Sequence, residues 1–360
     1  MARLNSQFNV PHPQVVFDET FCSQTWQGIP WQHRLIVVEP PQITSSGIIL
    51  EITGDDAGEV DIAIAFALAS HSQMRVAVLY QIPNQPLFGI EEDDLIAHTF
   101  VQFLETGDTS WPLLHPMVTA VLRAMDHLEP MGSGFFLTGA SKRGWTAWLA
   151  GLAHDTRVFG IAPRVFDNLV FHQQLDKQIA DWGTFSDEIS DYTRRQLQDL
   201  VDAPRGKELL ELVDPFFHLA NLSCPVLIVN GANDPYWTVD ALSIYWEKLP
   251  QPKACLVLPN QGHRLNLADW SNSVGQFAAS VDQGLPLPHM DWSTDEKIVA
   301  TNDVSDFEFW SASSDSLRFE QATWATGAPS GPNVAAVALG KVAGPDGDYL
   351  ISTPVKVLRG

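Results

Sequence analysis

Short apolar segments alternate with longer amphipathic segments along residues 33–281, and this alternation restricts the possible folds more than any other feature. The apolar segments are residues 33–40, 46–53, 74–82, 134–141, 158–166, 224–234 and 253–260, and helical patterns cover 60–72, 91–107, 116–128, 142–154 and 267–281. Continuous apolar strands separated by helices are typical of a parallel sheet that is covered on both faces. Ligands of such sheets bind at the carboxyl ends of the strands, so the residues that follow each strand are the first candidates for a site.

Two regions interrupt the alternation. Residues 167–223 are polar and aromatic with helical stretches, which predicts a helical cap of about 167–223 inserted between two strands. From residue 285 the helical pattern gives way to short alternating segments with turn signals such as Pro345-Asp346-Gly347, which predicts a small all-β, sandwich-like domain over 285–360. We therefore expect an N-terminal surface segment (1–32), an α/β domain (33–284) that carries the cap, and the β domain.

Ser141 occupies the junction between the strand 134–141 and the helix 142–154, in the stretch Gly139-Ala140-Ser141-Lys142-Arg143-Gly144. One interpretation is that the serine caps the helix, since serine is a favoured N-cap residue. The other is the nucleophile elbow of α/β-hydrolases, where small residues allow a strained turn that exposes the hydroxyl. The usual elbow pattern is G-x-S-x-G, and here the second glycine comes one position late.

The elbow interpretation predicts that an acid and then a histidine follow at later strand ends. Asp234 follows the strand that begins near residue 224, and His263 follows the strand that begins near 253. Serine is a weak nucleophile unless a base removes its proton. We therefore expect His263 to act as the base for Ser141, and Asp234 to orient the imidazole and stabilise its charged form.

An oxyanion hole would need two backbone donors. The N–H of Lys142, directly after the serine, is the first candidate. The loop 52–58 follows the third strand, so Gly54 or Asp55 would supply the second. The side chains of Lys142 and Arg143 either pair with acids such as Asp167 or bind an acidic substrate group.

Four residues near the cap or at strand ends are candidates for the substrate-binding wall: Asn84, Trp182, Tyr236 and Trp237. Trp145 and Trp148, three residues apart on the helix after the serine, are expected to pack in the core. The acidic run at 91–94 is expected to stabilise the start of a helix.

The chain has a formal net charge of −22, with 43 acidic and 21 basic side chains. Such a charge repels phosphate backbones, so nucleic acid is not expected as a partner. There is no apolar run long enough to span a membrane and no signal peptide in the given chain, which as written favours the cytoplasm. The three cysteines form no metal-binding pattern, although a bond between Cys224 and Cys255 stays open. We expect no metal and no cofactor.

Several stretches together resemble the PhoPQ-activated pathogenicity-related protein family of the α/β-hydrolase superfamily. They are residues 81–87, 92–118, 123–126, 138–169, 230–237 and 258–263, and more weakly 307–319. The resemblance implies a serine-hydrolase fold with a C-terminal β domain, and family members are often exported. One branch of the family is described as secreted proliferation regulators. The family often has a glycine pair after the third strand, where this chain has Gly54-Asp55.

These observations lead to a functional hypothesis with two alternatives. The favoured activity is that of a serine hydrolase, carboxylesterase-like, which cleaves an ester or amide of a small molecule or peptide through an acyl-enzyme. One alternative is a peptidase of the aminopeptidase type. The other is a non-catalytic binding or regulatory protein on a hydrolase scaffold. The sequence leaves the substrate and the oligomeric state open.

Overall fold

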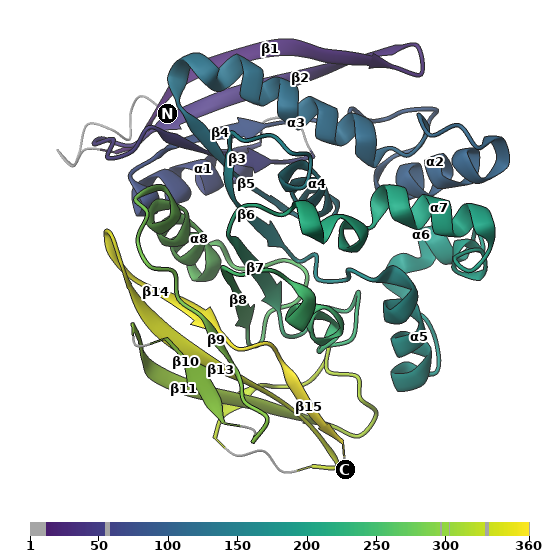
Figure 1. Ribbon diagram of the computed structural model, residues 1–360, viewed down its shortest axis with the longest axis vertical. Coiled ribbons are helices and arrows are strands. Elements are labelled where there is room, and N and C mark those ends of the chain that lie inside the picture. The colour runs from purple at the N-terminus through teal and green to yellow at the C-terminus, as the bar shows by residue number, and fades with distance from the viewer. Residues whose placement is uncertain (1–11, 55–57, 296, 302, 328–330, 360) are drawn as a thin grey trace.

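One large twisted sheet organises the molecule (Figure 1). The computed structural model describes residues 12–54, 58–295, 297–301, 303–327 and 331–359. The sheet has the strand order β1-β2-β4-β3-β5-β6-β7-β8-β14-β13-β11-β12, and β15 pairs with β13. Its parallel part consists of β3 (Gly47–Ile52), β4 (Arg75–Leu79), β5 (Gly134–Ala140), β6 (Val158–Arg164), β7 (Val226–Gly231) and β8 (Lys253–Leu258). All of these parallel strands lie in the predicted apolar segments.

A long antiparallel hairpin extends the sheet at its N-terminal edge. It is formed by β1 (Gln14–Trp26) and β2 (Ile29–Glu39), and β2 also pairs antiparallel with β4. The predicted surface segment 1–32 therefore contributes a strand to the sheet from residue 14 onward. The sequence pattern concealed this strand because β1 lies at the edge, where much of it is exposed and polar residues are tolerated.

Helices cover both faces of the sheet, and the side chains of the strands alternate between these two layers. Ile49 and Phe136 point to one face, where α1 (Glu59–Ser72) and α8 (Leu267–Asp282) pack. Leu50 and Leu137 point to the other face, which is covered by α2 (Glu92–Thr106), α3 (Leu114–Leu128) and α4 (Lys142–Gly151). Since each strand is buried on both sides, most of its residues are apolar without alternation, and the buried charges of Glu51 and Arg164 pair with each other.

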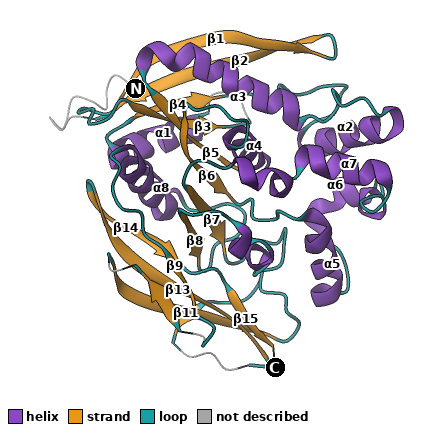
Figure 2. Cartoon of the chain, viewed as in Figure 1, coloured by secondary structure: helices purple, strands orange, loops and turns teal. Residues whose placement is uncertain are grey.

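The predicted cap is a cluster of short helices between β6 and β7. It contains α5 (Phe171–Trp182), η2 (Asp187–Ile189), α6 (Ser190–Thr193), η3 (Leu197–Asp199), α7 (Pro204–Val213) and η4 (Pro215–Asn221). Figure 2 shows these helices gathered beside α2, at one side of the sheet. Further short turns are η1 (Glu129–Met131), η5 (Ala241–Ile244) and η6 (Trp246–Lys248).

The C-terminal region is built from strands, as predicted. The strands are β9 (Met290–Trp292), β10 (Ile298–Ala300), β11 (Val304–Ser314), β12 (Ala325–Thr326), β13 (Asn333–Gly344), β14 (Gly347–Ser352) and β15 (Lys356–Arg359). β9 and β10 form a separate two-stranded sheet, whereas β14 meets β8 where Ser352 pairs with Cys255. A small apolar cluster that includes Ala232, Val257 and Trp324 joins the C-terminal strands to the ends of β7 and β8.

The three cysteines are free, and Cys224 and Cys255 are buried. The bond between these two that the sequence left open is therefore not formed. None of the described helices is both long and apolar enough to cross a membrane.

Candidate active site

Ser141 lies in the sharp turn between β5 and α4, with backbone angles φ 56° and ψ −128°. A positive φ is uncommon for a residue with a side chain and costs conformational energy, so the surrounding structure must hold it. The Ser141 N–H donates to the carbonyl of Arg164 at 2.9 Å, and its own carbonyl accepts from Trp145 at 3.0 Å. Its side chain makes no capping hydrogen bond to α4. The helix-cap interpretation of this serine therefore finds no support in the geometry.

Two glycines allow the turn to be this tight. A Cβ on Gly139 would lie 2.8 Å from the carbonyl oxygen of Arg143, and a Cβ on Gly144 would lie 2.9 Å from that of Arg164. Both distances are shorter than real Cβ contacts, so each position needs a residue without a side chain. The glycine that comes one position late in the elbow pattern thus has a packing role: it lets α4 approach the end of β6.

Asp234 and His263 are hydrogen-bonded to each other. The His263 Nδ1 atom lies 2.7 Å from Asp234 Oδ2, and the other carboxylate oxygen accepts the backbone N–H of Tyr236 at 3.0 Å. The Tyr236 ring stacks on the imidazole, with ring centroids 4.1 Å apart and an interplanar angle of 28°. The carboxylate and the tyrosine ring together define the orientation of the imidazole.

The loops that carry these two residues approach each other closely at the ends of β7 and β8. The Asn233 N–H donates to the carbonyl of Gln261 at 2.8 Å. A Cβ on Gly231 would lie 2.3 Å from that same carbonyl oxygen, so this approach requires glycine. Both loops therefore follow the carboxyl ends of β7 and β8, where the sequence predicted them.

The loop that carries Asp234 is held from two directions. On the cap side, Gln178 donates to the carbonyl of Tyr236 at 2.8 Å, and the Ser186 hydroxyl donates to that of Pro235 at 2.8 Å. On the other side, the Asn233 amide donates to the C-terminal region, at 2.9 Å to the Phe319 carbonyl and 2.7 Å to that of Ala322. The cap and the C-terminal region thus both fix the position of the Asp234 carboxylate.

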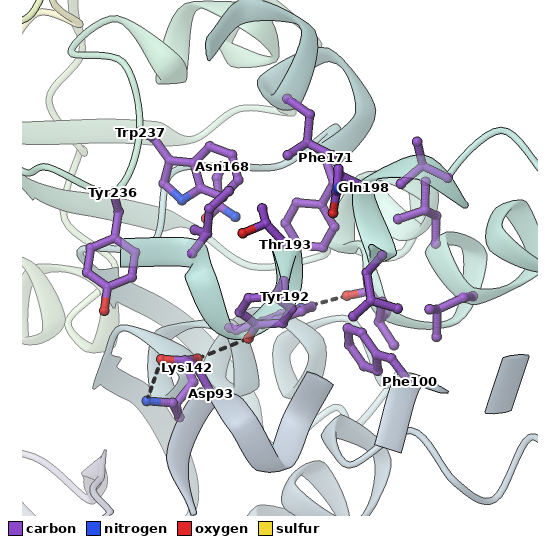
Figure 3. A pocket seen from close by; sticks show the side chains of 18 of the residues that line it. Asp93, Phe100, Lys142, Asn168, Phe171, Tyr192, Thr193, Gln198, Tyr236 and Trp237 are labelled. Carbon is purple, nitrogen blue, oxygen red and sulfur yellow. Dashed lines mark hydrogen bonds and ion pairs between the residues drawn. The ribbon is translucent and has the colours of Figure 1, made fainter. Parts of the chain in front are cut away.

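Ser141 and His263 both line one cavity under the cap. Figure 3 shows other residues of its wall, among them Lys142, Tyr192 and Tyr236. Lys142, Tyr236 and Trp237 also line this cavity, as two of the four predicted wall residues should. The His263 Nε2 atom is buried and has no hydrogen-bond partner among the described residues, Ser141 included. A buried imidazole nitrogen without a partner is available to exchange a proton with a group that enters the cavity.

The other two predicted wall residues, Trp182 and Asn84, lie outside this cavity. The Trp182 indole donates to the carbonyl of Leu317 at 3.2 Å and packs against the Arg318 guanidinium, 4.6 Å from the ring centroid. The Asn84 amide donates to the carbonyl of Gln32 at 2.8 Å. Trp182 therefore joins the cap to the C-terminal region, and Asn84 braces the loop after β4 against the first half of β2.

The two cations after Ser141 pair with the start of α2, so the predicted partner Asp167 is corrected to Glu92 and Asp93. Lys142 Nζ lies 2.5 Å from Glu92 Oε2 and 3.1 Å from Asp93 Oδ2, and Arg143 Nη2 lies 2.9 Å from Glu92 Oε1. Although burial alone would raise the pKa of Glu92, these cations hold that pKa well below its ordinary value. Glu92 and Asp93 thus hold α2 against the turn at Ser141. The sequence predicted only that the acidic run stabilises the start of a helix, not this contact with residues about fifty positions away.

The predicted oxyanion donors have different surroundings. Lys142 is the first residue of α4, and the N–H at this position has no acceptor within the helix. Gly54 packs against the guanidinium of Arg143. A Cβ placed on Gly54 would lie only 1.7 Å from the Nη2 atom of Arg143, so no side chain fits at this position. Asp55 lies outside the described residues.

Some cavity residues were not predicted as site residues. Trp145, assigned to the core, is buried and also lines the cavity. Its spacing of four from Ser141 could have suggested this, because residues four apart lie on one helix face. Asn168 follows β6 and lines the cavity as well, as the strand-end rule would have allowed. Tyr192, from the cap, carried no signal of this kind.

Asp167 lies close enough to Asp234 for their charges to interact. Burial and the neighbouring Asp234 carboxylate raise the pKa of Asp167 to about 8. A protonated Asp167 adds no second negative charge beside the carboxylate that binds His263. Within the described part of the chain, no group of three or more His, Cys, Asp or Glu side chains is arranged to hold a metal ion.

Comparison with solved structures identifies the fold. The chain is similar to acetyl xylan esterase 1 from Thermoanaerobacterium sp. JW/SL YS485, with a TM-score of 0.55 and 16% identity over 77% of this chain and 86% of that one. It is also similar to an acetyl xylan esterase from Paenibacillus sp. R4, with a TM-score of 0.51 and 14% identity over 74% of this chain and 87% of that one. The predicted α/β-hydrolase fold, with its cap and C-terminal strands, is confirmed.

Sequence comparison identifies the family. Autocrine proliferation repressor protein A of Dictyostelium discoideum is 30% identical over 299 residues, which cover 75% of this chain and 60% of the relative. The chain thus spans less than two thirds of that relative's length. A family model described as PhoPQ-activated pathogenicity-related protein matches residues 2–319. A match over this much of the chain shows that it belongs to the PhoPQ-activated pathogenicity-related protein family.

Proposed function

We propose that the protein is a serine hydrolase that cleaves carboxylic esters through an acyl-enzyme. The observation that carries the proposal is one cavity lined by Ser141, at an uncapped and strained elbow, and by His263, whose Nδ1 is bonded to Asp234 and whose Nε2 is unpaired. A serine that merely ended a strand would need neither the strained backbone nor an oriented imidazole in the same cavity.

In the first half of the reaction, the Ser141 hydroxyl attacks the ester carbonyl carbon and its proton passes to His263 Nε2. Asp234 stabilises the resulting imidazolium through Nδ1. The tetrahedral oxyanion receives the Lys142 N–H, and a donor from the loop after β3 completes its binding. When the carbon–oxygen bond breaks, the leaving alcohol takes the proton from His263, and the acyl group stays on Ser141.

In the second half, water enters and His263 accepts one of its protons while the oxygen attacks the acyl carbon. The acid product leaves when Ser141 recovers its proton from His263. Both halves use the same two donors and the same base, so one geometry serves two transition states. Asp167, whose pKa is raised to about 8, adds no second negative charge beside the Asp234 carboxyl at neutral pH.

A fluorophosphonate probe tests this proposal. The folded wild-type protein should be labelled at Ser141, because such probes react with a serine activated by a neighbouring base. The Ser141→Ala and His263→Ala variants should not be labelled. The matched variant Ser190→Ala changes a serine in the cap and should be labelled like the wild type. Absence of labelling in a wild-type protein that melts cooperatively would contradict the proposal.

One observation favours a second candidate, a regulatory protein that binds without catalysis. The relative from Dictyostelium discoideum is named as a proliferation repressor. If Ser141→Ala kept the full biological activity of this chain in a growth assay, the regulatory function would be independent of hydrolysis.

A further inference from the structure

The cavity that begins at Ser141 continues as an apolar chamber beneath the cap. Aromatic rings contribute much of its wall: Phe100 from α2, Trp145 from α4 and Phe171 from α5 all line it. Trp145 packs edge-on against both Phe171 and Phe100, with ring centroids 5.0 Å and 6.0 Å apart, respectively. Leu209 and Leu210 of α7 also line it. Figure 3 shows Tyr236 and Trp237 at one side of this chamber and Phe100 at the opposite side.

The size of the chamber restricts what can occupy it. Its volume is about 130 Å³. A protein cavity of about 150 Å³ lined by leucine, isoleucine and phenylalanine binds benzene. The space therefore suits a phenyl ring or a short alkyl chain, and it is larger than a single methyl group requires.

The charges in the wall are compensated within the protein. Lys142 lies between Glu92 and Asp93, and the second oxygen of Asp93 accepts the hydroxyl of Tyr192 at 3.0 Å. Burial and the nearby Asp93 raise the pKa of Tyr192, so this hydroxyl stays protonated and keeps donating. Asp93 is thus already bonded to a cation and a donor, and a substrate ammonium would have to displace them. The same applies to a substrate carboxylate that approaches Lys142.

Besides His263, two polar side chains in the wall have a buried oxygen without a hydrogen-bond partner among the described residues, and Asn168 is one of them. Asn168 lines the cavity, is 5% exposed, and its Oδ1 atom is buried without a hydrogen bond. Since buried carboxamides are nearly always hydrogen-bonded, this group is placed to bond a ligand atom. Gln198 from the cap also lines the cavity with a buried, unpartnered Oε1, so the chamber is mainly apolar with two neutral carboxamide oxygens in its wall.

We propose that the chamber binds the acyl group of the substrate, and that this group is uncharged and of medium size. The proposal rests on the serine-hydrolase function proposed above and names its substrate class: esters of saturated acids of about four to eight carbons, or of phenylalkanoic acids. Asn168 hydrogen-bonds a polar atom of the bound ester. Acetyl esters leave the chamber unfilled, and acyl groups with a free amine or carboxylate bring a charge that the wall does not match.

A series of 4-nitrophenyl esters from acetyl to hexadecanoyl tests the size of the acyl group. We expect kcat/KM to rise about threefold to fourfold for each added methylene, since each one leaves water, and then to fall beyond about eight carbons. Phenylacetyl should match the best alkanoyl ester. Succinyl and alanyl esters, which carry a charge, should be at least tenfold poorer than uncharged esters of the same length.

Two variants on the same helix localise the effect. Leu210→Ala enlarges the chamber and should move the best acyl chain to a greater length by about two carbons. The control Leu212→Ala removes the same atoms from a residue that does not line the cavity, and it should leave the optimum unchanged. Asn168→Leu should lower kcat/KM for all chain lengths by about three- to tenfold without moving the optimum.

The outcomes separate the two proposals. If the probe labels Ser141 but acetyl is the best ester and Leu210→Ala keeps the wild-type preference, the acyl-chamber proposal fails and the serine hydrolase stands. If Asn168→Leu changes nothing, its polar contact is refuted. If neither labelling nor hydrolysis of any ester occurs in folded protein, both proposals fall.

Discussion

The cap and the C-terminal strands are two additions to the same parallel sheet, and they meet the candidate site in different ways. The cap contributes side chains to the cavity wall, among them Phe171, Tyr192 and Leu210. Of the described residues from Met290 onward, none lines the cavity. The C-terminal region instead binds the back of the loops that carry Asp234 and His263, through Asn233 and the apolar cluster around Trp324.

We infer that the cap determines which substrate the cavity accepts, whereas the C-terminal strands support the loops of the site. Short helices joined by turns can present side chains to a cavity and vary in shape at little cost to the sheet. Strands that continue a sheet instead give a rigid backing, because each is bonded to its neighbours. We therefore expect changes in the cap to alter substrate preference, and changes in the C-terminal strands to alter stability first.

The largest expected effect is on the rate of hydrolysis when Ser141 is changed. Ser141→Ala should reduce kcat on the best ester by about 10⁴- to 10⁶-fold, because members of such a catalytic group act as a unit. Its thermal unfolding should stay cooperative. The measurement is steady-state kinetics beside a melting curve, and substantial residual hydrolysis by pure protein would show that the site has been misassigned.

The next effect tests the supporting role of the C-terminal strands. Trp324 is buried in the cluster that joins these strands to the ends of β7 and β8. Trp324→Ala should lower the free energy of unfolding by about 3–5 kcal/mol, the usual cost of removing a large buried aromatic side chain. At temperatures where the variant is folded, KM should be close to that of the wild type.

Urea denaturation gives this free energy, and Leu350→Ala provides the control because Leu350 lies on β14 with 37% of its surface exposed. The control should change stability by less than about 0.5 kcal/mol. A Trp324 variant with normal stability and a changed chain-length preference would reverse the roles given to the two regions.

A smaller effect is expected from the cap. Phe171→Ala removes an aromatic ring from the cavity wall and should lower kcat/KM for the preferred ester by about ten- to hundredfold, which corresponds to the loss of about 1.5–3 kcal/mol of apolar contact. Ile179→Ala, on the exposed side of the same helix, should have little effect. Equal losses in the two variants would indicate damage to the cap as a whole.

The last prediction concerns the dependence of stability on pH, an effect that is small for each pH unit, and the carboxyl group of Asp167. Asp167 has a pKa of about 8 in the folded protein, above its ordinary value, so between about pH 4 and 8 the folded state binds one proton more than the unfolded state. Stability should therefore fall as pH rises through this range, by up to about 1.4 kcal/mol per pH unit from this group.

Asp167→Asn removes this contribution, so its free energy of unfolding should depend less steeply on pH between 5 and 7 than that of the wild type. Chemical denaturation at a series of pH values measures both slopes. Identical slopes would show that Asp167 is ionised in the folded protein.

Much of this architecture could be predicted from the sequence because it depends on local patterns. A strand buried on both faces is mostly apolar, and the helices between such strands are amphipathic. The tight turn at Ser141 could also be predicted from the small residues around it, since a turn between a strand and a helix excludes larger side chains. That Asp234 and His263 lie close together could be predicted because the parallel sheet brings the carboxyl ends of its strands to one edge.

Only the tertiary structure decided the partners and the wall of the cavity. Lys142 and Arg143 pair with Glu92 and Asp93, about fifty residues away in the chain, and charge alone could not distinguish these acids from Asp167. Trp182 and Trp237 are equally aromatic, yet one faces the C-terminal strands and the other faces the cavity. The physical reason is that strand and helix formation depend on nearby residues, whereas the direction of a side chain at a surface between elements depends on how those elements pack.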